Sequence, residues 1–163
     1  MTARLFALFL TLTLGAAPFP EPTNNQPETT PLLSPAEALT KLHLPDGFRA
    51  TLFAGEPDVR QPIALCWDER GRLWVAENYT YADGKERFDL KLRDRIVIFE
   101  DADHDGRFDK RTVFTDEARM LTSLERGLGG VWALCPPNLL FIPMAGDKPA
   151  GPPQVVQIGR AHV

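Results

Sequence analysis

The chain has 163 residues, of which 44% are hydrophobic and 25% are charged, an ordinary composition for about one globular domain. Its 18 basic and 22 acidic residues give a net charge of −4 and are spread without long runs of one sign. This charge balance argues against a polybasic membrane patch and against a phosphate-backbone footprint, so we expect no nucleic acid to bind.

The first 17 residues have the order of parts typical of a secretory signal peptide. Arg4 is followed by an apolar run over residues 5–14 and by three small residues at 15–17. The apolar run is about half as long as the roughly 20 residues of a membrane-spanning helix. Residues 1–17 are therefore expected to direct export to the periplasm or the cell exterior, with a retained membrane anchor as the alternative.

Residues 18–34 are expected to form a disordered linker, because polar residues and proline dominate them and leave little apolar surface to bury. Ser34 then has the features of a helix cap, with Pro35 at the first helical position and Glu37 placed to reach back to the cap. A short helix is predicted from there to about residue 42.

Beyond residue 47 the pattern changes to short apolar or alternating runs separated by turn residues, which is typical of strands. Residues 68–72 and 105–106 have the polar side chains and the glycine of hairpin loops. The sequence therefore predicts an all-β domain. The expected strands span residues 48–54, 63–67, 73–76, 95–99, 112–114, 131–134 and 139–143.

A weak internal repeat indicates the blades of a β-propeller. Residues 64–66, a turn and residues 73–75 are echoed by residues 133–135, a turn and residues 140–142, so the copies begin 69 residues apart. This period exceeds the roughly 40–50 residues of common blades and fits one blade with a long insertion. A chance match of two generic hairpins is the alternative.

Cys66 and Cys135 occupy matching positions in the two copies of the repeat. Equivalent inner strands of different blades lie at least about 10 Å apart, whereas a disulfide tolerates a Cα separation of about 7 Å. Although export implies an oxidising compartment, we expect two buried free thiols.

Several blocks in the same order resemble the N-terminal propeller region of a dehydrogenase-like family. Its members are large secreted or membrane-associated proteins of planctomycete and verrucomicrobial bacteria, and they are similar to soluble quinoprotein sugar dehydrogenases. The resemblance extends over residues 44–156. The matching blocks are residues 44–48, 67–77, 93–96, 99–106, 129–132 and 136–143.

The resemblance implies a parent protein that oxidises a sugar or alcohol with pyrroloquinoline quinone (PQQ), binds a sugar or polysaccharide, and carries further blades and a haem domain. In such enzymes a histidine acts as the general base while Arg, Lys and Gln side chains hold the quinone. His43, His104 and His162 match no such base, so the catalytic and quinone-binding residues stay unassigned.

An acidic loop has the spacing of a calcium site, with carboxylates at alternating positions and Gly106 at the sharp turn. Its flanks are strand-like, and Thr112 stands where a helix-loop-helix site offers a bidentate glutamate, so a structural calcium hairpin is predicted. A solvated turn without an ion is the alternative. The predicted ligands are Asp101, Asp103, Asp105, the backbone carbonyl of Arg107, and Asp109.

Residues 78–81 and 119–126 are expected on connections between strands, either as ordinary polar loops, the favoured interpretation, or as the lining of a cofactor mouth. Residues 157–163 break the strand pattern and look like an in-frame translation of a sequencing adapter; a natural polar tail is the alternative.

Residues 35–156 are therefore expected to form about two blades of a truncated β-propeller that is inactive alone. Two other interpretations stay open. The propeller is a calcium-dependent module that binds polysaccharide or protein without catalysis, or it is a structural segment that completes an assembly by strand addition.

Overall fold

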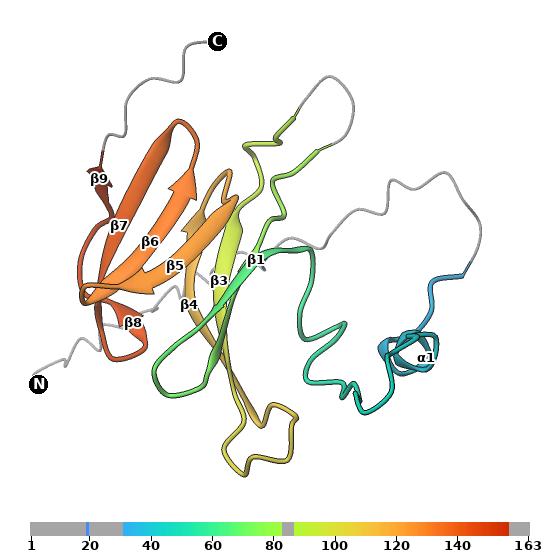
Figure 1. Ribbon diagram of the computed structural model, residues 1–163. Coiled ribbons are helices and arrows are strands. Elements are labelled where there is room, and N and C mark those ends of the chain that lie inside the picture. Colours follow the sequence, from blue (N-terminus) through green and yellow to red (C-terminus); the bar gives the residue numbers. More distant parts are fainter. Residues whose placement is uncertain (1–18, 20–30, 83–86, 157–163) are drawn as a thin grey trace, which may run out of the picture.

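A computed structural model describes residues 19, 31–82 and 87–156. The predicted signal peptide, most of the predicted linker and the predicted adapter-derived tail lie outside the described residues. The described part is all-β apart from one short helix, as the sequence predicts, and its strands form two antiparallel sheets with no closed barrel (Figure 1). This is the arrangement of about two blades of a partial β-propeller.

Each sheet follows the order of the chain, so that consecutive strands are hydrogen-bonded neighbours. In the second sheet, β8 and β9 both pair with β7. The first sheet contains β1 (Pro62–Trp67), β2 (Leu73–Glu77), β3 (Asp94–Glu100) and β4 (Lys110–Ala118). The second contains β5 (Ser123–Gly127), β6 (Gly130–Cys135), β7 (Asn138–Ala145), β8 (Lys148–Pro149) and β9 (Gln154–Val156).

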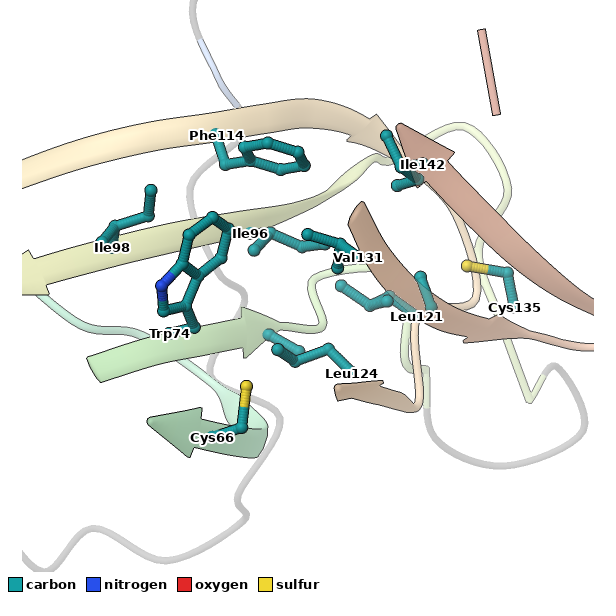
Figure 2. Close-up of a cluster of buried hydrophobic side chains, with 12 residues drawn as sticks. Cys66, Trp74, Ile96, Ile98, Phe114, Leu121, Leu124, Val131, Cys135 and Ile142 are labelled. Carbon is teal, nitrogen blue, oxygen red and sulfur yellow. The ribbon is translucent and has the colours of Figure 1, made fainter. Parts of the chain in front are cut away.

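The main core lies between the two sheets (Figure 2). Trp74, Ile96 and Phe114 from the first sheet meet Leu124 and Val131 from the second, and all five are buried. β5 lies against β1, which brings the two sheets together along their first strands (Figure 1). Burial of these large side chains is the principal source of stability for the pair of sheets.

A smaller core covers the opposite face of the first sheet. Val97 and Phe99 alternate along β3 with residues that face the main core, so the strand is buried on both sides. Phe53 and Val59 pack over them from the segment before β1, and Phe108 packs over them from the β3–β4 loop. Burial on both faces explains why this strand has an uninterrupted apolar run in the sequence.

The helix α1 (Pro35–Thr40) begins where the sequence predicts. The backbone N–H of Glu37 donates to Ser34 Oγ over 3.3 Å, and the backbone N–H of Ser34 donates to Glu37 Oε2 over 2.9 Å. This reciprocal capping box satisfies backbone donors that the first turn cannot satisfy itself. The helix ends two residues before the predicted end at residue 42.

The strand predicted at residues 48–54 is wrong: this segment forms no ladder. It lies as extended chain across the second face of the first sheet, where Phe53 and Ala54 join the smaller core. A one-sided apolar pattern fits both a strand and a covering segment, so the pattern alone cannot separate them. The sequence also failed to indicate β5, β8 and β9, which are short or polar.

The two copies of the internal repeat form the hairpins β1–β2 and β6–β7, but these hairpins occupy different positions in their sheets. β1 is the first strand of its sheet whereas β6 is the second, so by sheet order β1 corresponds to β5. The expected equivalence of the two cysteine positions is therefore wrong. Cys66 and Cys135 are nevertheless buried free thiols, as predicted, and burial raises the pKa of each to about 11.

Candidate functional site

The acidic loop connects β3 to β4 and is anchored at its base. The backbone N–H of Asp109 donates to the carbonyl of Glu100 over 2.8 Å, which closes the loop where the two strands separate. Phe108 packs edge-on against Phe99 with ring centroids 5.0 Å apart, and this contact ties the loop to the smaller core. The predicted metal-binding residues therefore stand on a hairpin whose root is fixed and whose tip is open to solvent.

Three of the predicted carboxylates converge. Ligand oxygens of Asp101, Asp103 and Asp109 lie within 4.8 Å of one another, with Asp101 half-buried and the other two exposed. Asp105 does not belong to this group; its Oδ1 accepts a hydrogen bond of 2.8 Å from the backbone N–H of Arg107. The ligand role of the Arg107 carbonyl stays a prediction.

Backbone donors inside the loop hold all three of these carboxylates in place, and the N–H of Asp105 donates to Asp103 Oδ1 over 3.2 Å. Asp101 accepts from the N–H of Gly106 over 3.0 Å, and Asp109 accepts from the N–H of Ala102 over 2.6 Å. Gly106 has a φ of +89°, a left-handed conformation that glycine adopts without strain. The loop is thus preshaped so that a cation would meet several oxygen ligands at once.

The donor set fits a hard cation. Carboxylate oxygens at alternating loop positions are the ligands that Ca²⁺ prefers, and softer metals favour nitrogen or sulfur. The mutual repulsion of three carboxylates at this separation is relieved by a bound cation. The site is on the surface and would hold the hairpin tip in one conformation.

A groove of about 480 Å³ runs beside the acidic loop. Leu65 and Trp67 from β1 line one part, and Asp101 and His104 line another. Trp67 is 55% exposed, unusual for so large an apolar side chain. The groove therefore brings a solvent-facing indole ring close to the candidate metal ligands.

Residues 78–80 are not an open polar loop but a buried hydrogen-bond network. Asn78 Nδ2 donates to the carbonyl of Leu121 over 2.8 Å, and Thr80 Oγ1 donates to Asp94 Oδ2 over 2.8 Å. The N–H of Leu121 donates to the same oxygen of Asp94, also over 2.8 Å. These bonds attach residues 119–122, which connect β4 to β5, to the first sheet. Tyr81, by contrast, is 63% exposed.

Residues 119–126, expected on a connection, are also largely built into the fold. Leu121 is fully buried in the main core, and residues 123–126 belong to β5. Arg126 points to the first sheet, where its guanidinium lies 3.2 Å from Asp68 Oδ2 and 4.8 Å from the centre of the Trp74 ring. The cofactor-mouth alternative has no support from this placement.

Asp68 is the centre of a buried charge network that the sequence did not indicate. Its Oδ2 accepts from Arg72 Nε over 2.8 Å and from Trp74 Nε1 over 2.9 Å, and Arg72 also binds Asp147 over 2.8 Å. Burial alone would raise the pKa of Asp68, but hydrogen bonds from Trp74 and Arg72 outweigh it and lower that pKa. The polar residues at 68–72 predict a turn, but the local sequence cannot predict the partners of these charges that are distant along the chain.

The described histidines are surface residues, as predicted. His43 and His104 are both exposed, and His162 lies outside the described residues. Neither described histidine is placed with a side-chain partner that would orient it as a base. Within the described ranges, no helix is long and apolar enough to cross a membrane.

Comparison with known proteins gives one family. The model of a family described as a domain of unknown function, DUF7133, matches residues 34–154, which include α1, the acidic loop and strands β1 to β8. No curated protein and no solved structure matches the chain. The chain therefore belongs to this DUF7133 family.

Proposed function

We propose that this chain supplies two blades, stabilised by bound calcium, of a larger, exported β-propeller that oxidises a sugar or an alcohol. The observation that carries the proposal is an apolar row on β1, formed by Ile63, Leu65 and Trp67, which are 51%, 60% and 55% exposed. Leu65 and Trp67 share one face because alternate residues of a strand do, and Ile63 adjoins them at the register shift between Pro62 and Ala64.

The opposite face of β1 supports this interpretation. Ala64 and Cys66 point from that face into the main core and pack with the second sheet. Leu65 pairs with Val75, so the apolar row lies on the side of the smaller core. It is next to the segment before β1, which covers part of that face. Exposed apolar surface of this kind marks an interaction site. A further sheet packed at about 10 Å would bury the row, as neighbouring blades do in a propeller.

Calcium has a structural role in this proposal. Asp101, Asp103 and Asp109 would hold the ion, and the carbonyl of Arg107 is a further proposed ligand. A cation there neutralises the repulsion within the loop and fixes the hairpin that separates β3 from β4. In this proposal the ion holds the loop and takes no part in substrate binding.

The redox part of the proposal rests on the family resemblance. Bound PQQ would accept the electrons removed from the substrate hydroxyl, and a haem domain would carry them onward. His43 and His104 are exposed and do not fit the role of the base, so we assign the base and the quinone-binding residues to other blades. The two blades described here would support that redox site structurally. Export would place the protein outside the cytoplasm.

The test uses the full-length protein reconstituted with PQQ and Ca²⁺, a panel of sugars and alcohols, and an artificial electron acceptor. We expect reduction of the acceptor that requires PQQ and one class of substrate. Saturable binding of a saccharide without any turnover across the panel would contradict oxidation.

A second function is favoured by the groove beside the acidic loop. There Trp67 offers an exposed indole face to a sugar ring, and Asp101 would place calcium nearby. A calcium-dependent module that binds polysaccharide without catalysis would use this groove. The substitution Trp67→Ala separates the two functions: it abolishes calcium-dependent polysaccharide binding in the module, but weakens only the packing of blades in the propeller. Phe48→Ala, at another exposed aromatic residue, is the matched control.

A further inference from the structure

A cavity of about 560 Å³ lies between the two sheets, on the side away from their contact along β1 and β5. The end of β4 and the connection after it form one wall, and the hairpin β6–β7 forms the other. Both walls belong to strands described here, so a further blade is not needed to form the cavity. It is separate from the acidic loop and from the groove beside that loop.

Small side chains keep this space open. In another part of the same interface, large rings fill the space between the sheets, and those of Trp74 and Phe114 have centroids 5.2 Å apart. Protein interiors rarely contain voids much larger than a water molecule, because side chains interdigitate. At the cavity, however, two strands contribute small side chains to the lining, Thr115 and Ala118 from β4 and Ala133 and Cys135 from β6.

The interior of the cavity is apolar and uncharged. Leu140 and Ile142 line it from β7, and Ile142 also belongs to the main core (Figure 2). The thiol of Cys135 is neutral at pH 7, since burial raises its pKa to about 11. Such a lining favours a ligand that buries apolar surface.

The two charged residues of the lining lie at its rim. Glu117 and Arg119 are both exposed. Glu117 pairs with Arg93 over 2.6 Å, and the guanidinium of Arg119 donates to the carbonyl of Leu90. Leu90 also lines the cavity and is 51% exposed although it is apolar. The cavity therefore opens to solvent at Leu90, and a ligand can enter there without local unfolding.

One amide in the lining is available to a ligand. Asn138, at the start of β7, is half-buried, and its side chain has no hydrogen-bond partner among the described residues. The amide of Asn78, by contrast, donates to the carbonyl of Leu121 over 2.8 Å. An amide carries both donors and an acceptor, and a hydrogen bond in apolar surroundings is stronger than in water. A ligand with one polar group would gain from placing it at Asn138.

We propose that this cavity binds a small uncharged molecule with an apolar body and a single hydroxyl group, which Asn138 would hydrogen-bond. The volume of about 560 Å³ lies within the range of about 300–1,000 Å³ that is usual for small-molecule sites. Such sites combine apolar walls with a few polar groups that orient the ligand. The inference needs neither calcium nor a quinone and stands apart from the proposed function.

The test is calorimetric titration of the full-length protein at pH 7 with 2-naphthol and with naphthalene, which are both uncharged at that pH. We expect saturable binding of 2-naphthol and a several-fold weaker affinity for naphthalene, which lacks the hydroxyl. Absence of 2-naphthol binding overturns the proposal.

A substitution that fills the cavity locates the binding. Ala118→Leu adds three carbons to the wall and should weaken the 2-naphthol affinity about tenfold or more. Ala38→Leu, the same change at an exposed position of α1, is the matched control and should leave the affinity unchanged. Equal affinities in the two variants would place the ligand elsewhere and overturn the proposal. If circular dichroism shows that Ala118→Leu does not fold, Ala118→Val replaces it: a several-fold loss is expected, and an unchanged affinity contradicts the assignment.

A second substitution tests the hydrogen bond. Asn138→Leu keeps nearly the same volume and removes the amide, so it should weaken 2-naphthol binding several-fold and leave naphthalene binding unchanged or tighter. An equal loss of affinity for both probes would contradict the role of Asn138.

Discussion

At the scale of single residues, buried charges determine how the chain is held together. Asp68 has no exposed side-chain surface, yet it bonds Arg72, Trp74 and Arg126, which come from both sheets. Local sequence predicts the turn that begins at Asp68, because the polar residues and the glycine are adjacent. It cannot predict the contact with Arg126, which depends on how two sheets pack.

Replacing Asp68 should therefore be costly. The variant Asp68→Asn leaves the guanidiniums of Arg72 and Arg126 partly buried without this counter-charge, so we expect the free energy of unfolding to fall by about 3–5 kcal/mol. Urea denaturation measures the change. Glu69→Gln is the matched control, because the Glu69 side chain is 74% exposed and its ion pair should contribute less than about 1 kcal/mol. Equal losses in the two variants would contradict the central role of Asp68.

The same residue predicts a pH dependence. The folded-state pKa of Asp68 is lowered, so its stabilising effect is full above the unfolded pKa of about 3.9 and is lost as the pH falls through the folded pKa. The difference in unfolding free energy between the native sequence and Asp68→Asn should be constant from pH 5 to 7 and shrink below about pH 4. A difference that stays the same down to pH 3 would contradict the assigned shift.

At the scale of elements, the β3–β4 hairpin shows what sequence patterns can and cannot provide. Alternating carboxylates and a glycine predicted a calcium loop, and the structure brings Asp101, Asp103 and Asp109 together. The turn of Asp105 toward the backbone of Arg107 depends on loop geometry that spacing does not encode. Residues 48–54 show the opposite error, because an apolar alternation there reflects packing on a sheet and not pairing within one.

Calcium should stabilise the protein through this hairpin. At a Ca²⁺ concentration 100 times the dissociation constant, we expect a gain of about 2.7 kcal/mol in unfolding free energy, seen as a rise in Tm. Asp103→Asn removes one of the converging carboxylates and should abolish most of that rise. Asp46→Asn, at an exposed carboxylate outside the loop, should keep it. A calcium-induced rise that survives Asp103→Asn would place the ion elsewhere.

At the scale of the whole molecule, the sequence predicted the class of fold but not its strand assignment. Strand-like runs and hairpin signals indicated two blades, and two antiparallel sheets are present. The repeat placed Cys135 one strand away from its correct position, because it matched the hairpin β6–β7 to β1–β2 without the polar strand β5. Short polar strands pair only when a neighbouring sheet already exists, so local pattern misses them.

An uncovered sheet face also predicts how the isolated chain behaves. The row formed by Ile63, Leu65 and Trp67 would be exposed to solvent and to other molecules, so we expect the chain alone to be marginally stable or to aggregate. Light scattering during thermal unfolding measures this. A single cooperative and reversible transition of a monomer would argue that no further sheet is needed.

Chemical labelling of Leu65→Cys in the full-length protein and in the isolated chain tests the propeller arrangement most directly. The natural thiols of Cys66 and Cys135 are buried with pKa values of about 11, so they react little at pH 8 in the folded state. Leu128→Cys, at an 89% exposed position, is the control and should be labelled in both proteins. If a further blade covers β1, Leu65→Cys is labelled rapidly in the isolated chain and protected in the full-length protein. Equally rapid labelling in the full-length protein would mean that no further blade covers β1, and would contradict the propeller.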